Sequence, residues 1–196
     1  MSAPSPPMPT LPMNLPARGP VGMACLIAAE TAIFTIFVVA YIFYIGKSVS
    51  GPQPKDVLSV PIFYTVCLLS SSITIHFAVS LLKKGKMGAF ALWWLGTIVL
   101  GATFLAGTAM EWRHLIYEEG LTIQTNLFGT TYYSLVGLHA FHVTVGLLAL
   151  ATVSIFTVLG KVKEEHSERT EVLSMYWHFV DVVWVVVFLV VYVIGR

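Results

Sequence analysis

Apolar residues along the chain gather into five long runs that polar and charged residues separate. The runs lie at about residues 22–45, 58–82, 88–112, 131–159 and 172–194. Each exceeds the roughly 20 residues that cross about 30 Å of hydrocarbon as an α-helix. None alternates apolar and polar residues in the manner of a membrane β-strand, and helices satisfy their own backbone hydrogen bonds in lipid. The pattern predicts an all-α, polytopic membrane protein, a bundle of five transmembrane helices.

Composition agrees with this prediction and excludes several classes of protein. Hydrophobic residues make up 57% of the 196 positions and charged residues 11%, against about 25% charged residues in soluble domains. The net charge of +1 gives no indication of a nucleic-acid partner. Cys25 and Cys67 fall in different predicted spans, so neither a disulfide framework nor a thiolate metal site is indicated. The chain has no glycine-rich phosphate loop and no nucleophile elbow, which excludes the usual soluble-enzyme chemistries.

The start of the chain differs from the rest, because residues 1–20 hold seven of the ten prolines. We expect these residues to form a proline-rich, disordered cytoplasmic tail, and residues 21–196 to form a single membrane domain. Lysines and arginines near the span ends favour the side of the tail by seven to four. The positive-inside rule therefore predicts a cytoplasmic amino terminus and an external carboxyl terminus.

Ionisable side chains inside the spans are the most informative polar residues. At the bilayer centre such a group costs on the order of 3 kcal/mol or more, so it usually faces a protein partner or a function. His76 and Glu111 lie near predicted helix ends, where headgroups or water can satisfy them. Glu30 lies about nine residues into its span and should be protonated or partnered. The spans contain Glu30, His76, Glu111, His139, His142, His178 and Asp181.

Two pairs of these residues have the spacing that places side chains on one helix face. His139 precedes His142 by three positions, and His178 precedes Asp181 by three. If the two faces meet, the cluster could bind a metal, relay protons or hydrogen-bond the helices together. No predicted span holds a complete Glu-x-x-His pair, the spacing that marks di-iron sites in helix bundles. The pattern therefore favours proton handling or helix association over metal binding.

Motifs in four spans resemble those of one membrane-protein family. The fifth span carries Tyr-Trp-His-Phe-Val-Asp-Val-Val-Trp at residues 176–184, and the fourth carries Gly-Leu-His-Ala-Phe-His-Val at residues 137–143. Weaker matches follow at residues 104–112 and 65–71 in the same order and spacing. Together they resemble the haem-copper oxidase subunit III family, also called cytochrome c oxidase subunit III. The resemblance covers nearly everything after the tail.

The sequence departs from the family pattern at four of these motif positions. Thr108 stands where glutamine is usual, and Trp112 stands where tyrosine is usual. Tyr64 replaces an asparagine, and Ala29 replaces the serine or aspartate that precedes the membrane carboxylate. Longer members also have two further amino-terminal helices, which form a lipid-filled cleft with the other five. The resemblance therefore implies the short, five-helix form of the family.

The resemblance implies an accessory, non-redox subunit III of a haem-copper terminal oxidase in aerobic respiration, in a bacterial-type plasma membrane. Its role would be to support assembly, stability and proton uptake of catalytic subunit I, with subunits I and II as partners. Haem and copper would belong to those partners, and this chain would hold no catalytic, cofactor-binding or metal residue. The residues expected in a structural polar network or in lipid contact are Glu30, Glu111, His139, His142, Trp177, His178 and Asp181.

Several alternatives stay open at this point. A small neighbouring subunit, as in quinol-oxidising relatives, could supply the wall that the two missing helices form elsewhere, and phospholipid could bind there. The chain could instead be a small proton or ion transporter that uses Glu30, or a membrane metalloenzyme that uses the histidines and Asp181. It could also serve a quinol oxidase or a nitric-oxide reductase, because the electron donor is oxidised by other subunits.

Overall fold

The computed structural model describes residues 18–195, and these residues are almost entirely helical. Five helical segments are long and apolar enough to cross a membrane, which confirms the predicted fold class. They are α1 (Arg18–Tyr44), α3 (Ile62–Leu82), α4 (Met87–Tyr117), α5 (Leu127–Val158) and the segment Glu164–Ile194. The last segment consists of a 3-10 turn η1 (Glu164–His166), α6 (Ser167–Phe188) and a π-helical end η2 (Leu189–Ile194).

Four of the five helical segments extend past one or both ends of the apolar runs that predict them. Helix α3 instead begins at Ile62, four residues after the expected start near 58, because Pro61 disfavours helix in the residue before it. Helix α1 begins at Arg18, before the expected start near residue 22, and Pro20 lies in its first turn, where no backbone N–H is needed. Helix α4 continues to Tyr117, and the last span begins at Glu164. The reason is that hydropathy follows the hydrocarbon layer, whereas a helix can continue into the headgroup region. The expected disordered tail lies outside the described residues, except for its last three, which are helical.

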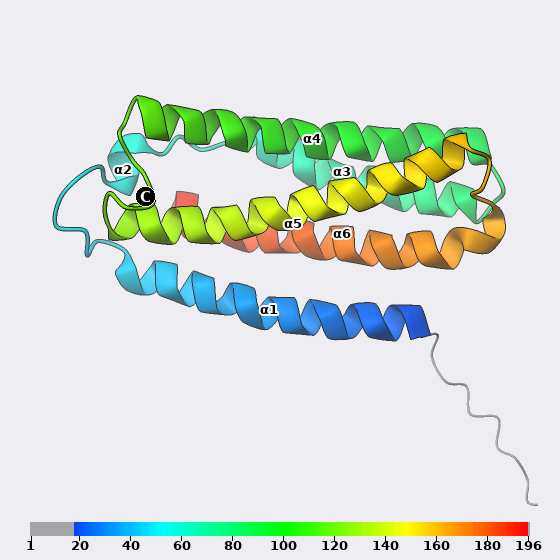
Figure 1. Cartoon of the computed structure of the whole chain (residues 1–196), viewed down its shortest axis with the longest axis horizontal. Helices are drawn as coiled ribbons and strands as arrows, with labels where there is room; N and C mark the ends of the chain where they lie inside the picture. The colour runs from blue at the N-terminus through cyan, green and yellow to red at the C-terminus, as the bar shows by residue number, and fades with distance from the viewer. Residues whose placement is uncertain (1–17, 196) are drawn as a thin grey trace, which may run out of the picture.

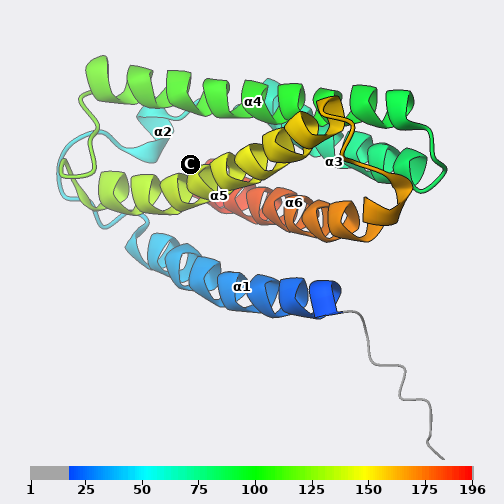
Figure 2. The same cartoon turned by 45° about the vertical axis from the view of Figure 1, so that its right-hand side comes forward.

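Four helices form a ring, and α1 lies at its edge. Each of α3, α4, α5 and α6 packs against the next, and α6 packs against α3 to close the ring. Helix α1 packs against α5 and α6 (Figures 1 and 2). Phe34 and Tyr41 are its buried residues, so most of its surface faces away from the ring. The ring is therefore the core of the bundle, and α1 is its most exposed helix.

Loops at the Tyr44 end of α1 are fixed to the start of α5. The short helix α2 (Pro54–Val57) lies in the α1–α3 connection. Asn126, the residue that caps α5, donates its side-chain amide to the carbonyl oxygens of Ser50 and Pro52 at 3.1 and 3.0 Å. Its carboxamide oxygen accepts the Gly129 backbone N–H at 2.8 Å, as a helix cap does. One side chain thus joins the start of a helix to a distant loop.

Trp177 on α6 lies where the four ring helices meet. Its side chain is fully buried, and its indole N–H donates to Ser71 Oγ on α3 at 2.8 Å. A methyl group added at Gly101 of α4 would lie 2.8 Å from one edge of the indole. A methyl group added at Gly146 of α5 would lie 2.8 Å from another edge. The absence of side chains at these two glycines therefore makes room for the ring.

We expect Gly101→Ala and Gly146→Ala each to destabilise the protein, because a buried ring with no space around it must shift to admit a methyl group, at a typical cost of about 1–3 kcal/mol. Thermal unfolding of the detergent-solubilised protein, followed by size-exclusion chromatography, measures the effect. Gly96→Ala on α4 is the matched control, since nothing lies within 4 Å of its added methyl group. Equal melting temperatures for Gly101→Ala and Gly96→Ala would contradict the role given to Trp177.

Candidate functional site

Polar side chains in the middle of the membrane join α3 to α6. Ser72 is the central residue of α3, and His178 lies within one residue of the centre of the last span. Both therefore lie about 15 Å from either end of a helix that just spans the hydrocarbon. We call the set of α3–α6 contacts at and around this level the polar seam. It consists of Thr65, Ser71 and Ser72 on α3, and Trp177, His178, Asp181 and Trp184 on α6.

Ser72 is the centre of the seam. Its hydroxyl donates to Asp181 Oδ2, and it lies 3.0 Å from His178 Nδ1. Because a hydroxyl has a single proton, the His178 contact then uses Nδ1–H as donor. The other ring nitrogen of His178 lies 3.2 Å from Ser174 Oγ on the same helix. The expected His178–Asp181 pair is thus held from α3, by a serine.

Two tryptophans extend the seam on either side of this centre. Trp177 donates to Ser71 at 2.8 Å, and Trp184 donates its indole N–H to Thr65 Oγ1 at 3.2 Å. Thr65 and Ser71 are six positions apart and Trp177 and Trp184 are seven, so the two contacts lie about two helical turns apart along α3 and α6. Of these four residues, only Trp177 was expected in a polar network from the sequence; Trp184, Ser71 and Thr65 were not. The hydroxyl residues within the otherwise apolar span of α3, among them Thr65, Ser71 and Ser72, are the signal that could have indicated the α3 side of these contacts.

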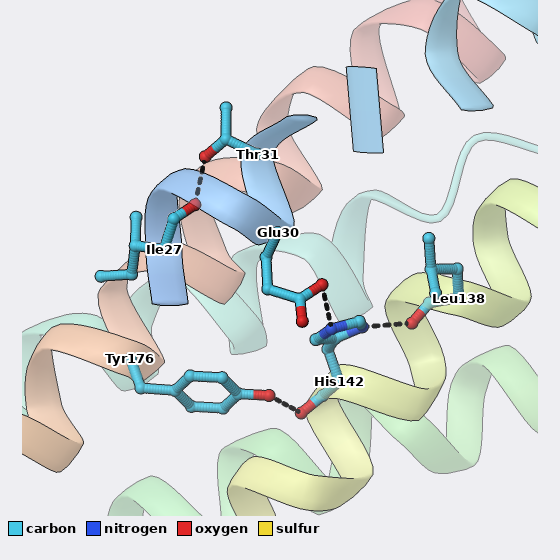
Figure 3. A network of polar contacts seen from close by, with 6 residues as sticks. All are labelled: Ile27, Glu30, Thr31, Leu138, His142 and Tyr176. Carbon is cyan, nitrogen blue, oxygen red and sulfur yellow. Dashed lines mark hydrogen bonds and ion pairs between the residues drawn. The ribbon is translucent and has the colours of Figure 1, made fainter. Parts of the chain in front are cut away.

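Glu30 and His142 form a second contact, between α1 and α5 (Figure 3). Each lies within one residue of the middle of its helix, and Glu30 Oε2 is 3.1 Å from His142 Nε2. His142 Nδ1 donates to the Leu138 carbonyl oxygen at 2.8 Å, since a carbonyl only accepts. The remaining proton therefore lies on Glu30 or on His142 Nε2, between the two residues. In either position the pair has no net charge, which lowers the cost of placing it in hydrocarbon.

Helix α6 also contacts this second site. The Tyr176 hydroxyl donates to the His142 carbonyl oxygen at 3.2 Å (Figure 3). The Phe34 ring of α1 lies 5.0 Å from the His142 ring, centroid to centroid. Side chains from α1 and α6 therefore converge on one residue of α5, His142. The Glu30–His142 hydrogen bond attaches α1, the most exposed helix, to the ring.

His139 is separate from both sites, although it lies only three residues before His142. Its side chain is fully buried, stacked on Trp184 at 5.0 Å and edge-on to Phe104 at 5.7 Å. Neither ring nitrogen bonds to another described residue. The two helix faces that could have met do not meet, because His142 faces α1 while His178 and Asp181 face α3. The expected residues are thus divided among distinct environments.

Glu111 contacts the π-helical end of the last span. The Tyr192 hydroxyl lies 2.9 and 3.0 Å from the two Glu111 carboxyl oxygens, and 3.4 Å from the Tyr132 hydroxyl. Because α4 runs past residue 112, Glu111 and His114 do form a Glu-x-x-His pair within one helix. The two side chains diverge, however, since His114 Nδ1 lies 2.8 Å from Glu118. Within residues 18–195, no three His, Cys, Asp or Glu side chains converge as metal ligands would.

Comparison with known proteins gives a consistent set of relatives. A sequence model of the family described as "Cytochrome c oxidase subunit III" matches residues 19–196. Cytochrome c oxidase subunit 3 of Bacillus subtilis is 33% identical over 90% of this chain and 86% of its own length. The Corynebacterium diphtheriae protein of that name is 34% identical over 93% and 91%. Cytochrome bo(3) ubiquinol oxidase subunit 3 of Pseudomonas aeruginosa is 33% identical over 89% and 84%.

We expect Ser72→Ala to destabilise the bundle, because Asp181 and His178 would lose a shared partner inside the membrane. Buried polar groups left without a partner cost about 1–3 kcal/mol each in general. Ser134→Ala is the matched control, since the Ser134 hydroxyl bonds only to the Thr130 carbonyl of its own helix. Thermal unfolding in detergent compares the two variants. If the Ser72→Ala and Ser134→Ala proteins are equally stable, the polar seam does not help to hold the ring together.

We expect Glu30→Ala and His142→Ala to have coupled effects on stability, because each removes the partner of the other. The coupling energy in a double-mutant cycle should lie near the upper end of the range for membrane proteins, which is about 0.6 kcal/mol on average and about 1.7 at most. Thr31→Ala combined with His142→Ala is the control cycle, because the Thr31 hydroxyl bonds to the Ile27 carbonyl of its own helix. Additive effects of the Glu30 and His142 changes would contradict the pairing.

Proposed function

The chain belongs to the cytochrome c oxidase subunit III family and is an accessory subunit III of a haem-copper oxidase, and from this we propose how the fold serves the oxidase. The helix bundle stabilises the complex around catalytic subunit I and supports its proton uptake, while holding no redox centre itself. The observation that carries this proposal is the use of the polar side chains at mid-membrane. Ser72, His178 and Asp181 bond across α3 and α6, and Glu30 and His142 bond across α1 and α5. These polar side chains hydrogen-bond helices to one another.

The partners follow from the same family membership. The chain is part of an oxidoreductase complex with other oxidase subunits. We propose subunits I and II as the neighbours, and a bacterial-type plasma membrane with the amino terminus in the cytoplasm. Relatives are named as subunits of both a cytochrome c oxidase and a ubiquinol oxidase, so family membership leaves the electron donor open.

The exposed side of α1 is where we place lipid or a further small subunit. An apolar groove of about 630 Å³ lies between α1 and α6, lined by residues such as Phe34, Val38, Phe179 and Val183. Its volume and lining suit a phospholipid acyl chain. The outward side of α1 remains uncovered within the described chain, and a small neighbouring subunit that covered it would supply the wall that longer members form from their own first two helices.

We expect His142→Ala and Asp181→Asn to leave the haem spectrum and the initial rate of oxygen reduction of the purified oxidase near those of the wild type. Sustained turnover should fall several-fold, since the weakened subunit dissociates or no longer supports proton uptake. Oxygen consumption followed over many turnovers, together with the visible spectrum, separates the two effects.

Glu30→Gln is the companion variant, because glutamine keeps the size of the side chain and cannot ionise. It should also retain haem and the initial rate. Loss of haem in this variant would contradict the accessory role. Unchanged assembly and sustained turnover in all three variants would contradict the proposal that these residues support the complex.

A further inference from the structure

His76 is an ionisable side chain that no contact within the described chain explains. It is exposed, and it makes no hydrogen bond to another described residue, although its ring lies 6.2 Å from that of Phe77. Six residues separate it from Leu82 at the helix end, so it lies about 9 Å inside a helix that just spans the hydrocarbon. Its imidazole hangs from a single methylene, and helical side chains tilt toward the amino terminus of their helix, so His76 is poorly placed to reach the headgroups beyond Leu82 that would otherwise satisfy it. In this chain alone, a polar ring points into lipid.

The surroundings of His76 make an apolar face with a polar centre. His76 follows Ser72 by one helical turn, on the side of α3 that meets α6. Leu69 and Ile73 of α3 are 37% and 59% exposed, and Val182 of α6 is 63% exposed. His178, bonded to Ser72, is half-buried at the same edge. We call Leu69, Ile73, His76, His178 and Val182 the outer α3–α6 face; its α6 residues, His178 and Val182, also form the edge of the groove between α1 and α6.

The outward sides of α4 and α5 have no such feature. Over residues 88–110 of α4 and 131–158 of α5 the large exposed residues are apolar, for example Leu92, Val99 and Leu148. The exposed His114 near the end of α4 has a partner, since its Nδ1 lies 2.8 Å from Glu118. Two threonines beside the apolar residues bond to carbonyl oxygens of their own helices: Thr103 to Val99, and Thr152 to Leu148, each at 2.8 Å. Lipid satisfies such a surface completely. Acyl chains cannot hydrogen-bond to an imidazole, whereas a polar side chain on another transmembrane helix can.

We propose that the outer α3–α6 face is the surface on which this chain packs against a transmembrane helix of the haem-carrying subunit. His76 meets a hydroxyl, carboxamide or carboxyl group on that helix, and the apolar residues around it form the rest of the contact. This proposal rests on the proposed function, since it assigns a face to the partner that the accessory role requires. Because His76 needs a hydrogen-bond partner that acyl chains lack, a protein helix fits this face better than lipid does.

Photo-crosslinking in the intact complex tests this assignment. A benzophenone amino acid is placed at Ile73, or at Leu148 on α5 as a control of similar exposure, 59% against 65%. After irradiation in native membranes, the complex is purified through a tag on this chain and the adducts are identified by mass spectrometry. We expect position 73 to crosslink to the haem-carrying subunit and position 148 to give no such adduct.

The other outcomes are distinguishable. Adducts with the haem-carrying subunit from position 148 but not from position 73, or adducts from 73 with a subunit that carries no haem, would overturn the assigned face while leaving the proposed function intact. If the tagged chain purifies without haem before irradiation, both the face and the proposed function are wrong.

Substitutions of His76 give a second, independent measurement. His76→Leu should lower the fraction of haem complexes that retain this chain in detergent by about threefold to tenfold, because a polar contact in the membrane is lost. His76→Gln should restore most of the retention, since a carboxamide can still hydrogen-bond. Equal retention for His76→Leu and the wild type would overturn the contact assigned to His76.

Discussion

The packing of Trp177 is the interaction on which the rest of the bundle depends. In lipid, helices gain no hydrophobic free energy by associating, because hydrocarbon tails are as apolar as leucine side chains. Close packing and interhelical hydrogen bonds must hold them instead. Trp177 supplies both: its ring occupies the space left by two glycines on α4 and α5, and its N–H reaches a serine on α3. A single side chain of α6 thus sets its distance to every other helix of the ring.

Helix α1 is held by a different kind of contact. It lies outside the ring, buries little of its surface, and contacts α5 through one polar pair at the centre of the membrane. The ring therefore has the properties of a rigid core, whereas α1 is an attached helix whose position depends on Glu30 and on what covers its outer side.

Sequence reasoning predicted the helices well and the contacts between them only in part. Long apolar runs were sufficient for five spans, because length and hydropathy alone determine which segments can cross lipid. The shared face of His178 and Asp181 also followed from spacing, since it depends on helix geometry within one element. Their partner Ser72 did not follow, because it depends on how α3 is rotated and placed against α6. His139 shows the same limit: one turn from His142, it faces aromatic rings while His142 faces α1.

The shared proton between Glu30 and His142 has a consequence for a protein in an energised membrane. A respiratory membrane carries an electric potential, and moving one elementary charge across it takes about 2.3 kcal/mol per 100 mV. Two separate charges at mid-membrane would each feel this field. Because Glu30 and His142 form a pair with no net charge, the field exerts no net force on the contact, and any dipole of the pair spans only the 3.1 Å between Glu30 Oε2 and His142 Nε2. The attachment of α1 is therefore nearly independent of the voltage across the membrane.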